Sequence, residues 1–206
     1  MQDLLSSTLY LLALINPISK VFVLSVLAGE MVPRELRRIS IRSSLVAITI
    51  LLLFAAIGNF VLERIFHVEL YSLQIAAGVV LFTMGAKALF KGIFFEVPDR
   101  ERLAEVSIVP LASPMIAGPS VIAATMSFTM DKGLALASGT VVIAVGANLA
   151  IMLAARPISG FLKRYNIMGA LIRITGLIVA TMAVQMVLSG IAEWHGTLGP
   201  AAAAGG

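Results

Sequence analysis

Long, mainly apolar runs alternate along this chain with short segments that carry its charges. A helix that crosses a bilayer needs about 20 consecutive, mainly apolar residues. No run alternates polar and apolar residues in the way that the strands of a membrane barrel do. The pattern therefore predicts an all-α membrane protein with six transmembrane helices, at about 4–28, 43–62, 70–91, 106–130, 133–155 and 168–192.

Composition supports a membrane protein and excludes several classes of function. Of the 206 residues 59% are hydrophobic and 13% are charged, against about a quarter charged in soluble domains. The chain has no cysteine, and its two histidines, His67 and His195, are too few for a metal site. Neither H-E-x-x-H nor G-x-S-x-G occurs, so we expect neither an enzyme nor a resident cofactor or metal.

The positions of the basic residues predict the orientation. The chain has a formal net charge of +4, but its Lys and Arg side chains flank the spans, so no nucleic acid partner is expected. The opposite face carries only Arg64 and Lys132. Cytoplasmic loops are enriched in Lys and Arg, so we expect a multi-pass cytoplasmic (inner) membrane protein with both termini outside. The predicted inner face carries Arg34, Arg37, Arg38, Arg42, Lys91, Arg100, Arg102, Arg156, Lys163 and Arg164.

Two matches between the halves of the chain indicate an internal repeat. Asn16-Pro17 in the first span corresponds to Ser113-Pro114 in the fourth at an offset of 97, and Gly78 corresponds to Gly176 at an offset of 98. Three spans per half reverse the direction of the second half, which predicts two inverted three-helix repeats. We expect a first repeat over 1–95, a cytoplasmic linker over 96–105, a second repeat over 106–192 and a C-terminal tail over 193–206.

Prolines at corresponding depths predict that the first and fourth helices are broken. Proline removes a backbone donor and is unfavourable inside a helix. A break exposes N–H groups, which attract a carboxylate, and carbonyl groups, which hold an ammonium group or a cation. Broken backbone at bilayer depth is tolerated where it lines a cavity. The predicted substrate-binding residues are Asn16, Pro17, Ser19, Ser113, Pro114, Ala117, Gly118, Pro119 and Ser120.

Three motifs resemble the MarC family of bacterial and archaeal inner-membrane proteins: "NPI" in the first span, "VPLASPMIAGPSVIA" in the fourth and "RITGLIVATMAVQMVLSGI" in the sixth. The resemblance implies six spans. For the family's SnatA-type members it implies transport of glycine, alanine and similar amino acids, driven by an ion gradient. This chain departs from the family pattern at Ser19, which replaces a glycine, and at Gln74, which replaces an arginine. Arg173 matches the family.

Polar residues within the spans are candidates for a cavity or for coupling. Lys20 either lines the cavity as a cation for a carboxylate or reaches the headgroups because the break shortens its span. Asn148 either joins helices or faces substrate, and Lys87 and Arg173 are expected to extend to the inner surface. No Asp or Glu lies within a span. A coupling ion would thus be Na⁺ held by carbonyl and side-chain oxygens, or H⁺ acting through Lys20, and coupling can also be absent.

The predicted function is a membrane transporter of small neutral amino acids that works by alternating access. Its expected partners are that substrate and the lipid bilayer, and assembly into a homo-oligomer stays open. An efflux protein for drugs or other solutes is one alternative, disfavoured by an aromatic content of only 7% and by a predicted site of small residues. A membrane assembly factor that transports nothing is the other alternative.

Overall fold

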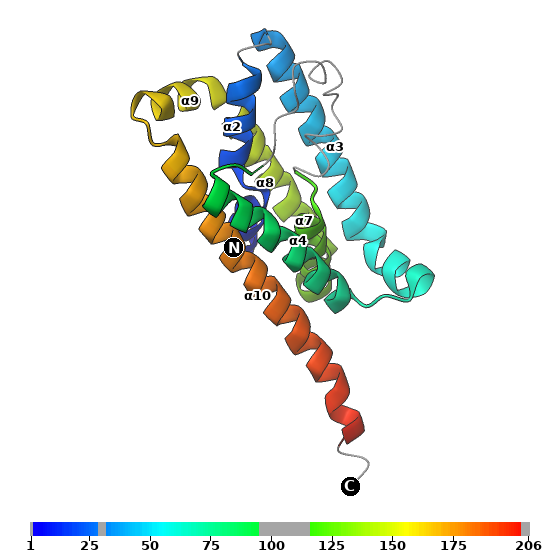
Figure 1. Ribbon diagram of the computed structural model, residues 1–206. Helices are drawn as coiled ribbons and strands as arrows, with labels where there is room; N and C mark the ends of the chain where they lie inside the picture. Colours follow the sequence, from blue (N-terminus) through cyan, green and yellow to red (C-terminus); the bar gives the residue numbers. More distant parts are fainter. Residues whose placement is uncertain (1, 29–31, 95–115, 203–206) are drawn as a thin grey trace.

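A computed structural model describes residues 2–28, 32–94 and 116–202, and in these ranges every regular element is a helix (Figure 1). Residues 95–115, which include the predicted linker and the first part of the predicted fourth span, lie outside the described residues. The helices are α1 (Gln2–Ile15), α2 (Pro17–Leu27), α3 (Pro33–Phe60), the π-helical η1 (Val61–Phe66), α4 (Leu70–Lys91), α7 (Pro119–Lys132), α8 (Leu134–Leu153), α9 (Ala155–Arg164) and α10 (Met168–Ala202).

Five segments among the described residues are long and apolar enough to cross a membrane. They match the first, second, third, fifth and sixth predicted spans, and α4 has the predicted bounds. The fourth predicted span is represented only by α7, which is 14 residues long. The five segments are Gln2–Leu27, Pro33–Phe66, Leu70–Lys91, Leu134–Leu153 and Met168–Leu198.

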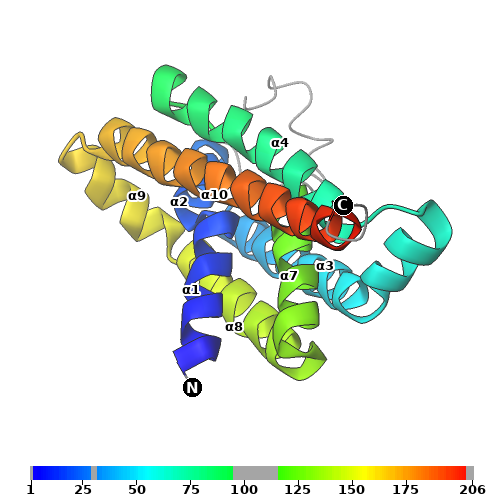
Figure 2. The same cartoon turned by 90° about the horizontal axis from the view of Figure 1, so that it is seen from below.

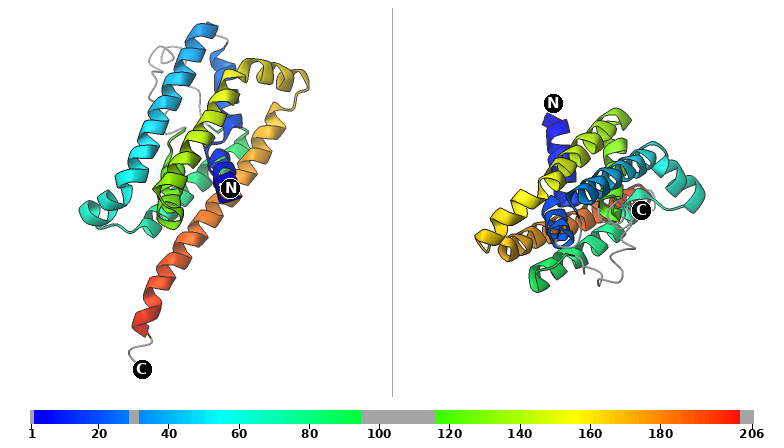
Figure 3. Two further views of the ribbon diagram at one scale, coloured as in Figure 1. Left: turned by 180° about the vertical axis from the view of Figure 1, so that it is seen from behind. Right: turned by 90° about the horizontal axis from the view of Figure 1, so that it is seen from above.

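The helices differ from the prediction in two boundaries and in one additional helix. Helix α3 begins at Pro33, so the arginines expected in a loop lie on its first turns. Its start is favoured by proline at the first helical position and by the Glu35 carboxylate, which accepts the Val32 N–H at 3.3 Å. Helix α9 was not predicted, and it lies across the end of α8 before the chain turns into α10 (Figures 1 and 3). Helix α10 continues to Ala202, so residues 193–202 are helical.

Helix α8 packs against α1 and α3 and is also in contact with α7 (Figure 2). Large apolar side chains also remain exposed on the outside of the helices. Single exposed apolar residues are common on soluble proteins, but apolar exposure along whole helices fits a lipid surface. Examples are Leu53, Phe82, Ile143, Ile178 and Leu188.

The most extensive helix contact among the described residues joins α4 and α10, which run side by side (Figures 1 and 2). Small residues allow the two backbones to approach closely. A Cβ added at Gly85 would lie 2.8 Å from the Gly176 carbonyl oxygen, and one added at Gly78 would lie 2.9 Å from the Ala183 carbonyl oxygen. The residue 98 positions after Gly78 is Gly176, and the residue 98 positions before Ala183 is Gly85. The offset therefore relates the contact Gly78–Ala183 to the contact Gly176–Gly85. The helices therefore meet at positions that the sequence offset relates.

Candidate functional site

The first membrane segment is broken at Asn16, between α1 and α2. Asn16 adopts the left-handed conformation, with φ 58° and ψ 77°. Pro17 follows as the first residue of α2 and has no N–H to donate to the turn before it. The Asn16 side-chain oxygen accepts the Ser19 N–H at 3.4 Å, and the Ser19 hydroxyl donates to the Asn16 carbonyl at 2.7 Å. These bonds cap α2 and give the chain a helix N-terminus at the level of the break.

A second helix N-terminus begins in the same way at Gly118. Gly118 is the N-cap of α7, and Pro119 is its first helical residue. The prediction that Pro119 breaks the fourth span concerns the residues before Ile116, which lie outside the described residues, so it stays a prediction. Proline is favoured at the first helical position because the N–H it lacks would have no partner there. The cap-and-proline pair of α7 lies 102 residues after Asn16-Pro17, whereas the sequence comparison had aligned that pair with Ser113-Pro114.

Both helix N-termini open onto one cavity of about 490 Å³. Helices α2 and α7 lead away from this region toward opposite ends of the molecule (Figure 1). The volume is typical of small-molecule sites. The cavity brings together six of the predicted residues: Asn16, Ser19, Lys20, Gly118, Pro119 and Ser120. Its remaining walls are mainly apolar and come from Leu14, Ile15, Ala77, Val80, Leu81, Thr83, Met84, Lys87, Phe94, Val121 and Val179.

Four of the other predicted residues are described and do not line this cavity: Pro17, Ala117, Asn148 and Arg173. Pro17 and Ala117 each lie beside a lining residue in the chain, while Ser113 and Pro114 lie outside the described residues. Asn148 is 0% exposed within α8, and its amide nitrogen lies 3.2 Å from the Met152 sulfur. Arg173 lies at the C-terminal end of α4, with its Nε 3.9 Å from the position a Cβ would take at Gly92. Asn148 is therefore buried beside a residue of its own helix, and Arg173 lies where helix-end carbonyls attract a cation.

Lys20 points back into the break. Its side chain is 2% exposed. The ammonium group donates to the Ile15 carbonyl and to the Ser19 hydroxyl, the latter at 3.3 Å. Of the two alternatives that the sequence left open, the geometry matches the cavity-lining cation. If Lys20 extended to the lipid headgroups, its ammonium group would not lie at the Ile15 carbonyl and the Ser19 hydroxyl.

Sequence reasoning missed the contribution of α4 to the cavity. Lys87 lines it as a second cation, although we had expected this residue to extend to the membrane surface. Thr83, Met84 and Lys87 lie three, four and seven residues after Val80, so the four side chains share one face of α4. That spacing was the available signal, together with the recurrence of Thr83-Met84 as Thr181-Met182 at an offset of 98. Only the packing of α4 against α10 and α7 shows which way this face points.

The cavity is suited to bind an anionic group that is joined to a small apolar body. Helix N-termini present N–H groups and partial positive charge, and the two lysines place cationic groups at the same cavity. Apolar walls favour an alkyl group. In the described parts of the chain, no group of three or more His, Asp or Glu side chains is placed to hold a metal ion.

Comparison with known proteins agrees with the membrane architecture. The MarC family, described as integral membrane proteins, matches residues 1–195. A UPF0056 membrane protein of Pyrococcus horikoshii is 32% identical over 190 residues, covering 92% of this chain and 94% of the relative. The UPF0056 inner membrane protein YhgN of Escherichia coli is 28% identical over 200 residues, covering 94% of this chain and 98% of the relative. No solved structure matches this chain.

Proposed function

The chain belongs to the MarC family of integral membrane proteins, and on this basis we propose that it transports small neutral amino acids of the glycine and alanine class across the cytoplasmic membrane. One observation carries the proposal. The N-termini of two helices, α2 and α7, open onto the same cavity inside a chain of membrane-spanning helices. Helix breaks of this kind form the substrate sites of many secondary transporters, where they bind anionic substrate groups.

The substrate carboxylate would lie between the caps of the two helices. There the free N–H groups at the starts of α2 and α7 and the Lys20 ammonium all favour negative charge. The substrate ammonium group would bind acceptor oxygens, for which the hydroxyls of Ser120 and Thr83 are available in the lining. A small side chain would contact the apolar wall. Gly118, which has no side chain, leaves space at the cap of α7.

We propose alternating access between two inverted repeats as the mode of transport. Two relations support the repeat: the matching cap-and-proline pairs at the starts of α2 and α7, and the Gly78–Ala183 and Gly176–Gly85 contacts that the 98-residue offset exchanges. Any antiparallel helix pair has a local two-fold axis, so the informative point is that the 98-residue offset exchanges these two contacts. Rocking of one repeat against the other would then expose the cavity to each side in turn.

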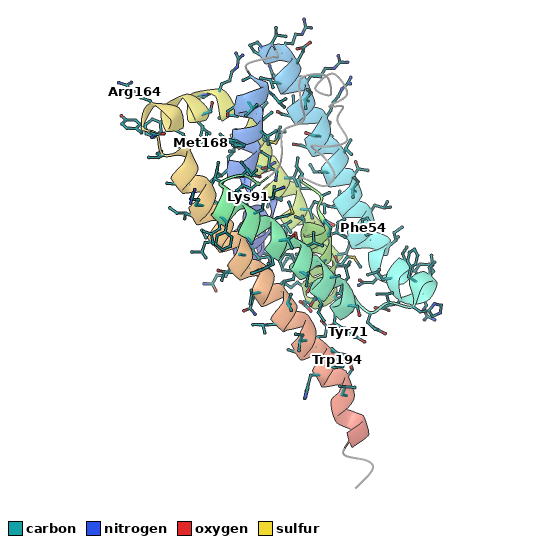
Figure 4. The ribbon with its side chains drawn as sticks, in the orientation of Figure 1. Phe54, Tyr71, Lys91, Arg164, Met168 and Trp194 are labelled. Atoms are coloured by element: carbon teal, nitrogen blue, oxygen red, sulfur yellow. The ribbon has the colours of Figure 1, made fainter. Side chains whose placement is uncertain are left out.

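The proposed orientation places both termini outside. Arg164 lies near one end of the molecule, whereas Tyr71 and Trp194 lie toward the other (Figure 4). Basic residues favour the cytoplasmic side, and Tyr and Trp favour the membrane interface. The relative YhgN is named an inner membrane protein, which supports the cytoplasmic membrane as the location.

The test is uptake of radiolabelled glycine and alanine by proteoliposomes that contain the purified chain, with imposed H⁺ or Na⁺ gradients. Accumulation driven by one gradient would support a coupled carrier and identify its ion. Equilibration without accumulation would indicate uncoupled transport. If folded protein moves neither amino acid, the proposal is wrong, and solute efflux or an assembly role becomes the better explanation. Thermal stabilisation by hydrophobic cations, but not by glycine or alanine, would favour efflux.

A further inference from the structure

The break at Asn16 leaves the Ile15 carbonyl without its helical partner. In a continuous helix the Ser19 N–H would donate to this carbonyl, four residues back. Here the Ser19 N–H lies instead 3.2 Å from the Asn16 carbonyl and 3.4 Å from the Asn16 side-chain oxygen. The Lys20 ammonium group donates to the Ile15 carbonyl in its place. A side chain of the protein itself therefore fills the position that the break opens.

The surroundings of this ammonium group are those of a cation site and not those of an ion pair. It donates to the Ile15 carbonyl oxygen and to the Ser19 hydroxyl oxygen. Among the described residues, no Asp or Glu lines the cavity, and the other charged lining residue, Lys87, is also a cation. Carbonyl and hydroxyl oxygens at an unwound helix are the ligands that hold Na⁺ in transporters with broken helices.

We propose that the Lys20 ammonium group is a tethered cation that occupies the monovalent-cation position of the broken first helix. The inference rests on the proposed function and assigns its ion requirement. A substrate carboxylate then binds beside a positive charge that never leaves the protein, so uptake requires no Na⁺. Removal of the ammonium group exposes the Ile15 carbonyl and the Ser19 hydroxyl to the cavity, where a Na⁺ or methylammonium ion can replace it.

The experiment compares alanine uptake by proteoliposomes in sodium, methylammonium and choline media at the same imposed membrane potential. Wild-type uptake should be the same in all three media. Lys20→Ala should lose about tenfold or more in choline, the factor expected for a lost hydrogen bond to a charged group. Sodium or methylammonium should restore a large part of this loss. Lys20→Arg, which keeps the charge, should stay independent of Na⁺.

Two variants serve as controls. Lys20→Met removes the charge but fills the same space, so cations should not restore its uptake. Lys91→Ala removes an exposed lysine at the end of α4, outside the cavity, and should behave as wild type in every medium. Wild-type uptake that requires Na⁺, or Lys20→Met uptake equal to that of wild type, would overturn the tethered cation. These two outcomes do not depend on whether Lys20→Ala folds.

A binding measurement separates this inference from the proposed function. Sodium chloride or methylammonium chloride, compared with choline chloride, should raise the Tm of detergent-solubilised Lys20→Ala by about 2–4 °C. The Tm of wild type and of Lys20→Met should not change. If wild type transports neither glycine nor alanine, the proposed function fails while this series still tests the cation site. An equal response in all three proteins would overturn the site, whatever the transport result.

Discussion

Gly85 of α4 and Gly176 of α10 face each other so closely that neither position has room for a side chain. A Cβ at Gly85 would lie 2.8 Å from the Gly176 carbonyl oxygen, and a Cβ at Gly176 would lie 2.9 Å from the Gly85 carbonyl oxygen. Real Cβ atoms do not approach other heavy atoms this closely. In a bilayer, where lipid tails are as apolar as side chains, close backbone packing is a main source of helix association.

We expect Gly85→Ala to destabilise the protein by roughly 1–3 kcal/mol, because the added methyl group pushes the two backbones apart. The measurement is the Tm of the detergent-solubilised protein, which should fall by several degrees. Gly146→Ala is the matched control, because nothing lies within 4 Å of a Cβ at that position in α8. The double variant Gly85→Ala/Gly176→Ala should lose less than the sum of its parts, since the first change already separates the helices. Full additivity would contradict the shared contact.

Gly118→Leu should abolish amino acid uptake while the protein stays folded. Gly118 has φ −74°, which leucine adopts without strain, so the added side chain acts by filling the cavity. Gly118→Ala should reduce alanine uptake more than glycine uptake, because the larger substrate needs more of the same space. Uptake and Tm are measured together. Gly146→Leu adds the same side chain where a Cβ meets no neighbour and should transport normally. Unchanged uptake by Gly118→Leu would remove the α7 cap from the site.

Asn16→Ala should destabilise the protein more than Asn16→Gly, by about 1–2 kcal/mol. Both changes remove the side-chain cap of α2, but alanine also has to adopt the left-handed conformation that glycine adopts freely. The difference in the midpoint of chemical unfolding between the two variants measures this strain. If the Asn16 amide also contacts substrate, both variants should lose uptake despite their different stabilities. Equal stabilities of the two variants would show that the break does not hold position 16 at positive φ.

Single cysteines should report the orientation of the chain, since it has none of its own. Arg164 and Trp194 are exposed and lie toward opposite ends of the molecule (Figure 4). In intact cells, a membrane-impermeant thiol reagent should label Trp194→Cys but not Arg164→Cys. Both should react after the membrane is permeabilised. The reverse pattern would invert the proposed topology, and labelling of both in intact cells would contradict a membrane between them.

The amino-acid sequence by itself determined five of the spans and the first break. Spans follow from local hydropathy, because each helix must match the bilayer thickness whatever its neighbours are. The bounds of α4 were predicted correctly for this reason. The break at Asn16 was also predictable, because proline at position 17 removes a hydrogen bond in any tertiary context. The sequence around Pro119 did not predict that this residue begins α7, because a proline is compatible both with a kink inside a helix and with the first position of a helix.

Only the tertiary structure decided which polar residues share a cavity. Lys20 and Lys87 lie on different helices, and no sequence spacing relates them, yet they line the same space. Asn148 resembled them in its apolar surroundings but packs within α8 beside Met152. The direction in which a polar group in a membrane helix points depends on how that helix is rotated against its neighbours. That rotation is set by contacts such as Gly85 on Gly176, which only the folded chain brings together.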